Sequence, residues 1–84
     1  MLNQEELAKK LFQSVDILPQ PYLYLAEVSA DAGEWGQVAA SVISGALKAD
    51  KIPDLSLLQE ALDLWGRDEL GILVDKASAV WLTT

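Results

Sequence analysis

Proline and glycine divide this chain of 84 residues into segments that each carry the apolar spacing of an amphipathic helix. The division points are Pro19 and Pro21, Gly33, Pro53 and Gly66. No segment alternates polar and apolar residues over the length of a strand. The sequence therefore predicts an all-α fold, a small compact bundle of four or five short helices, with stacked helical hairpins as one arrangement. The length fits a single helical domain over residues 1–84.

The first predicted helix covers residues 4–18. Asn3 is its expected N-cap, and Glu6 lies at the position that completes a capping box. Pro19 should end this helix, because the residue before a proline avoids the α region. Its apolar face consists of Leu7, Ala8, Leu11, Phe12, Val15 and Leu18.

The second and third predicted helices meet at Gly33, which is expected at the C′ position. Pro21 suits the first position of the second helix, whose apolar residues are Leu25, Ala26, Val28 and Ala32. The third helix has the clearest apolar stripe, made of Trp35, Val38, Ala39, Val42, Ala46 and Leu47. Gly45 in this helix either lowers its stability or allows another backbone to approach closely.

The fourth predicted helix has two candidate N-caps, Asp54 and Ser56, and is expected to end at Gly66. Its buried stripe consists of Leu58, Ala61, Leu62 and Trp65. Asp68 is the expected N-cap of a fifth helix. The apolar face of this last helix consists of Leu70, Leu73, Val74, Ala77, Val80 and Trp81.

Two stretches resemble known helical families. The stretch from Leu25 to Asp50 resembles a degenerate tetratricopeptide hairpin in its Gly33-Glu34-Trp35 turn and its Ala46-Leu47 pair, which implies stacked helical hairpins. The order Leu18-Pro19 to Val42-Ile43, followed by Ala61-Leu62-Asp63-Leu64-Trp65-Gly66, looks like the start and end of an HD-related output domain, a helical signalling module in bacteria. The central part of that pattern is missing here, and neither resemblance assigns a functional residue.

The chain contains no histidine and no cysteine, so it lacks the commonest general base, the commonest transition-metal ligand and the strongest side-chain nucleophile. None of its serines lies in a G-x-S-x-G motif, and it has neither a glycine-rich phosphate loop nor a calcium-binding loop. Ser44 and Lys48 are one helical turn apart, a spacing that is common on any solvated helix face. Acidic pairs such as Asp68 and Glu69 suit helix starts. The sequence therefore predicts a protein that is not an enzyme and has no cofactor and no metal.

Thirteen acidic and six basic residues give a net charge of −7. Such a chain should repel nucleic-acid phosphates and anionic membrane surfaces, so neither is expected as a partner. The longest uncharged stretch, Trp35 to Leu47, is too short to span a bilayer. The first residues mix acids with apolar residues, unlike a secretory signal, and the absence of cysteine fits a reducing compartment, so a cytoplasmic location is expected.

The chain has more apolar residues than its helix stripes account for, and this excess indicates a protein-binding surface. The three tryptophans are expected in the core, whereas consecutive residues of the run 21–25 point all round a helix turn. The predicted partner-binding patch consists of Tyr22, Leu23, Tyr24, Leu55 and Leu57. Its partner would be another protein, with a homodimer as the simplest version and an acidic rim that attracts a basic surface. The alternative is an acidic inhibitor (an immunity protein, an antitoxin or a nucleic-acid mimic) whose carboxylates occupy a basic partner surface.

Overall fold

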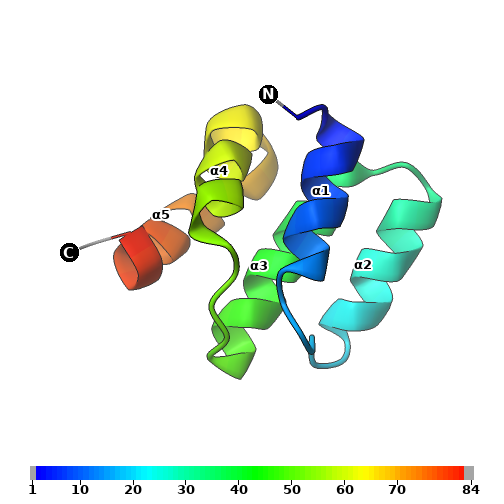
Figure 1. The fold of residues 1–84 in the computed structure, drawn as a ribbon, viewed down its shortest axis with the longest axis horizontal. Helices are drawn as coiled ribbons and strands as arrows, with labels where there is room; N and C mark the ends of the chain where they lie inside the picture. Colours follow the sequence, from blue (N-terminus) through cyan, green and yellow to red (C-terminus); the bar gives the residue numbers. More distant parts are fainter. Residues whose placement is uncertain (1, 83–84) are drawn as a thin grey trace.

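A computed structural model describes residues 2–82, and it confirms the all-α prediction (Figure 1). Helices account for nearly all of the regular structure, and no strand occurs within that range. In chain order the elements are α1 (Gln4–Gln13), α2 (Tyr22–Asp31), α3 (Trp35–Ala49), α4 (Leu55–Leu70), α5 (Leu73–Ala77) and a π-helical turn, η1 (Ser78–Leu82). Figure 1 shows α2 and α4 on opposite sides of the pair formed by α1 and α3.

Helix α3 is the central element, because α1, α2, α4 and α5 all pack against it. The stripe predicted for it is largely confirmed, with Val38, Ala39, Val42 and Ala46 almost completely buried. Ile43 is also fully buried. It was not among the residues named for the stripe, but it lies one turn from both Ala39 and Leu47 and so belongs to the same side of the helix.

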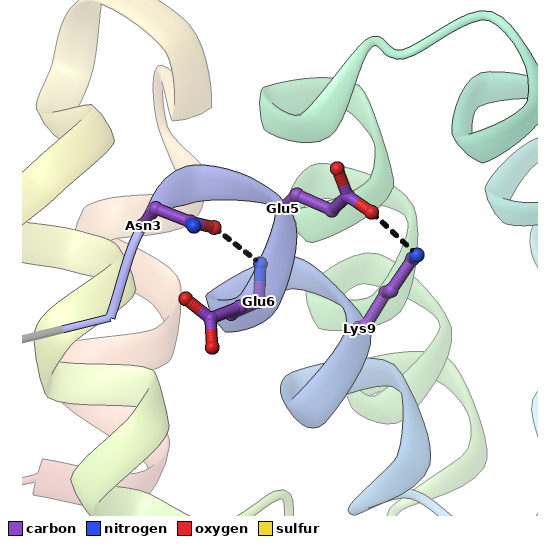
Figure 2. A network of polar contacts seen from close by, with 4 residues as sticks. All are labelled: Asn3, Glu5, Glu6 and Lys9. Atoms are coloured by element: carbon purple, nitrogen blue, oxygen red, sulfur yellow. Dashed lines mark hydrogen bonds and ion pairs between the residues drawn. The ribbon is translucent and has the colours of Figure 1, made fainter.

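Side-chain caps start two of the helices. The Asn3 side chain accepts a hydrogen bond of 2.8 Å from the backbone N–H of Glu6, which confirms the predicted N-cap of α1 (Figure 2). At α4 the two candidates are resolved in favour of Asp54, whose carboxylate accepts from the backbone N–H of Leu57 at 3.1 Å. Each cap satisfies one of the amides that a helix start leaves without an internal partner.

Helix α1 ends at Gln13, so the prediction that it runs to Leu18 is wrong. Ser14 explains the early end, because its hydroxyl donates to the carbonyl of Leu11 at 2.7 Å. The same hydroxyl accepts a hydrogen bond of 3.1 Å from the backbone N–H of Asp54, which ties the end of α1 to the start of α4. Val15 and Leu18 remain buried outside the helix, because the chain beyond α1 folds back onto the core.

Two glycines confirm their predicted roles around α3. Gly33 has a φ of 73°, as expected for a C′ residue in the left-handed region. Gly45 allows a close approach, because a Cβ atom there would lie 2.6 Å from the Cδ2 atom of Leu18 and 2.9 Å from the Cβ atom of Tyr22. The start of α2 therefore lies directly against the backbone of α3.

The chain after Gly66 differs from the predicted fifth helix. Gly66 does break α4, with φ 60° and ψ −162°, but the helix resumes beyond it and ends at Leu70. A second left-handed glycine, Gly71, separates α4 from α5, which begins at Leu73. Asp68 therefore lies inside α4, and the prediction that it starts the fifth helix is wrong. The reason is that two glycines, five residues apart, each interrupt the helix, so that the last helix begins after Gly71 and not after Gly66.

Candidate functional site

Helix α2 has apolar residues on two opposite sides. Its inner side packs chiefly against α3 and carries small or apolar residues, with Ala26 fully buried. The other side carries Tyr24, Leu25 and Val28, which are 61%, 45% and 45% exposed. We call these three residues the outer face of α2. An apolar side of a helix normally packs against other apolar residues, and here only the inner side is covered by the rest of residues 2–82.

Leu25 and Val28 were named with Ala26 among the apolar residues of this helix, and the structure separates them, because Ala26 is buried whereas Leu25 and Val28 are exposed. The contact with α3 decides the orientation of the helix. Gly45 has no side chain, so α2 approaches α3 through the side that bears Tyr22 and Ala26. The sequence signal that could have revealed this is the spacing of small residues at Ala26 and Ala30, one turn apart.

The five residues of the predicted patch lie in different surroundings. Tyr24 belongs to the outer face, whereas Leu23 is half-buried against the core and Tyr22 lies beside α3. Leu55 is 43% exposed at the start of α4, and Leu57 is half-buried against the core. Because α2 and α4 flank the α1–α3 pair on opposite sides, the structure does not gather these five residues into one patch (Figure 1).

The three tryptophans pack against the core, but each is only partly buried. Trp35, at the start of α3, lies under the ammonium group of Lys9, which is 5.6 Å from the ring centroid. The same ammonium forms an ion pair of 2.6 Å with Glu5, one turn earlier on α1 (Figure 2). The tryptophan rings are therefore partly accessible to solvent, but at Trp35 the ammonium group of Lys9 already lies over the ring.

Carboxylates border the outer face of α2. Glu27 and Asp31 are exposed and lie one turn apart, along the edge of the helix next to Tyr24. The sequence contains no basic residue between Lys10 and Lys48. The outer face is thus an apolar strip with an acidic edge and without a nearby cation on its own helix.

An ion pair at the surface joins α4 to α5. The guanidinium of Arg67 donates two hydrogen bonds, of 2.7 and 2.5 Å, to the carboxylate of Asp75. These hydrogen bonds hold the pKa of Asp75 below its ordinary value, with the guanidinium charge acting in the same direction. The pair spans the turn at Gly71 and orients α5 relative to the end of α4.

The polar side chains in the described part of the chain are partly or fully exposed. No polar or charged side chain among residues 2–82 is buried, and no three acidic side chains in that range are grouped as metal ligands. Ser44 and Lys48 line the same groove on α3, as their spacing requires. Apolar surface and exposed charge are the features that this arrangement offers for binding.

Within residues 2–82, no helix is both long enough and apolar enough to cross a membrane. Comparisons of the chain with protein-family models, with curated proteins and with solved structures found no match.

Proposed function

We propose that this protein is a non-enzymatic interaction module that binds a basic, amphipathic segment of another protein on the outer face of α2. The supporting observation is the pair of apolar sides on α2, of which one packs on α3 and the other meets solvent. Exposed apolar residues with a polar rim are typical of protein interfaces. Tyrosine is also a preferred anchor residue in such interfaces, which suits Tyr24.

The size of the outer face favours a transient complex. Complete burial of a large apolar side chain contributes about 1.5–3 kcal/mol relative to full exposure. Tyr24, Leu25 and Val28 are about half exposed, so covering all three would contribute roughly 3 kcal/mol in total. A micromolar complex requires about 8 kcal/mol. The remainder would have to come from neighbouring contacts and from the acidic edge of the helix.

The charge pattern favours a basic partner over a second copy of this chain. Glu27 and Asp31 would attract lysine or arginine side chains of a partner and would raise the association rate. In a twofold dimer through α2, the same carboxylates would face their own counterparts. We therefore favour a different protein as the partner. The absence of cysteine suits a cytoplasmic setting for such a complex.

The acidic inhibitor is the second candidate, and a distinct observation supports it. Among residues 2–82, every acidic side chain except that of Glu60 is exposed, and only Glu5 and Asp75 form ion pairs. Most of the other carboxylates carry a charge that no cation of the described residues neutralises, so they could face a basic surface. Such a complex would depend on salt concentration far more steeply than one held by apolar side chains.

Affinity capture with matched variants tests the proposal. The double variant Tyr24→Ser/Val28→Ser removes the centre of the outer face. Ile72→Ser is the control, because Ile72 is an apolar residue beyond α4 that is 66% exposed. Proteins captured from native lysate by the wild type should persist with Ile72→Ser and be lost with the double variant, at low and at moderate salt. Circular dichroism should confirm that both variants fold.

Two results would contradict the proposal. An unchanged set of captured proteins with the double variant would show that the outer face is not the docking surface. Loss of capture for wild type and Ile72→Ser alike at moderate salt would favour the acidic inhibitor instead.

A further inference from the structure

An open groove of about 510 Å³ crosses the surface of α3, between the start of α2 and the segment formed by α5 and η1. Its apolar lining comes from Leu47 of α3, Leu73 of α5 and Ala79 and Val80 of η1. The volume lies in the range of small-molecule sites. The groove is distinct from the outer face of α2, because α2 contributes to it only through Tyr22, on the side that approaches α3.

Two lysines, Lys48 on α3 and Lys76 on α5, are the charged residues of this lining. Within residues 2–82 neither ammonium group forms an ion pair. The carboxylate of Asp75, the neighbour of Lys76 in sequence, accepts its hydrogen bonds from Arg67. No carboxylate lines the groove. In a chain with thirteen acidic and six basic residues, two unpaired cations beside one apolar groove form a local exception to the charge of the molecule.

The same lining includes Tyr22 and Ser44, whose side chains carry hydroxyl groups. Each can donate a hydrogen bond to an anionic oxygen. The groove therefore combines an apolar floor for hydrocarbon with two cations and two neutral donors for a negative head group. Charge-assisted hydrogen bonds from lysine are about twice as strong as neutral ones, so the cations would dominate recognition of the head group.

We propose that this groove binds a single-chain amphiphile with one carboxylate, of the fatty-acid class, with the chain along Leu47, Leu73 and Val80 and the carboxylate between Lys48 and Lys76. A ligand with one negative charge fits better than an acidic protein segment or a nucleic acid. The net charge of −7 repels anions at long range, and this repulsion grows with the charge of the ligand.

Decanoate is the test ligand, and decanol is its neutral counterpart. Decanoate should bind saturably in isothermal titration calorimetry at low salt and below its micellar concentration. Decanol should bind about tenfold more weakly or worse, because it lacks the charge that the lysines recognise. In ¹⁵N-resolved NMR spectra, the amide signals of Ser44, Leu47 and Ala79 should shift with decanoate.

Charge-matched variants separate the groove from the general effect of charge. Lys48→Met/Lys76→Met should weaken decanoate binding about tenfold or more, because both head-group contacts are lost. Lys9→Met/Lys10→Met removes the same charge from α1, outside the groove lining, and should leave the dissociation constant within about twofold. Thermal unfolding should show that both variants fold.

The proposal is overturned if decanoate does not saturate, if decanol binds as tightly as decanoate, or if both lysine pairs have equal effects. Shifts confined to amides outside the groove would overturn it as well. None of these outcomes bears on the outer face of α2, since Tyr24→Ser/Val28→Ser should bind decanoate as the wild type does.

Discussion

Gly45 sets the separation between α2 and α3, and it does so by lacking a side chain. A Cβ atom at this position would lie closest to the Cδ2 atom of Leu18 and the Cβ atom of Tyr22. The Cβ atom of Tyr22 is bonded to its own backbone, so it cannot move aside independently. Gly36, at the start of the same helix, is different. A Cβ there would meet the side chain of Glu69, which is flexible and can move aside.

We predict that Gly45→Ala destabilises the protein by about 1–2 kcal/mol. Alanine gains roughly 1 kcal/mol of helix propensity relative to glycine. Overpacking of a close contact costs about 1–3 kcal/mol, and we expect a cost in the upper part of that range here, because the Cβ atom of Tyr22 is fixed. Gly36→Ala is the matched control and should be neutral or slightly stabilising. Urea denaturation of both variants measures the difference. A Gly45→Ala variant as stable as Gly36→Ala would mean that the contact between α2 and α3 is not tight.

At the scale of elements, local hydrogen bonds determine where a helix begins, whereas the neighbouring helices determine which of its sides is buried. Asn3 and Asp54 cap their helices through hydrogen bonds to amides three residues on. The sides of α2, in contrast, are distinguished only by the position of α3. The C-terminal elements depend on both, since Gly71 turns the chain and α5 then packs against α3 and α4, with the Arg67–Asp75 ion pair at the surface.

We predict that the contribution of Asp75 to stability is lost at acidic pH. The pKa of Asp75 is lowered in the folded protein by its hydrogen bonds from Arg67, so the pair stabilises the fold above the ordinary carboxyl pKa. This stabilisation disappears as the pH falls from about 4 through the lowered pKa. Both groups are exposed, so the effect should be small and should also fade in high salt.

The measurement is urea denaturation of wild type and Asp75→Asn at neutral pH and near pH 3, each at two salt concentrations. Asp68→Asn is the control, because the carboxylate of Asp68 forms no ion pair within residues 2–82. A gap between wild type and Asp75→Asn that persists near pH 3 would show that the ion pair is not its source.

At the scale of the whole molecule, α3 is enclosed by its neighbours while α2 is covered on one side only. The two surfaces proposed for binding differ in charge. The outer face of α2 has an acidic edge, whereas the groove across α3 carries Lys48 and Lys76. The basic protein segment and the acyl carboxylate that we propose as ligands would therefore occupy separate places on the surface.

We predict that the purified chain is a monomer at micromolar concentration and low salt. The net charge of −7, together with Glu27 and Asp31 beside the outer face, opposes contact between two copies. Sedimentation equilibrium tests this prediction. A dimer under these conditions that Tyr24→Ser/Val28→Ser disrupts would make a second copy of the chain the partner of α2, in place of a basic protein.

The sequence by itself determined the helical class, the start of α1 at Asn3 and the turn at Gly33, because each depends on residues within a few positions of one another. Only the tertiary structure decided where α1 ends, since the hydroxyl of Ser14 also binds Asp54, forty residues away. The same holds for the proposed binding surface. Tyr24 belonged to the predicted patch, but which residues accompany it depends on the side of α2 that meets Gly45, and no local pattern specifies that contact.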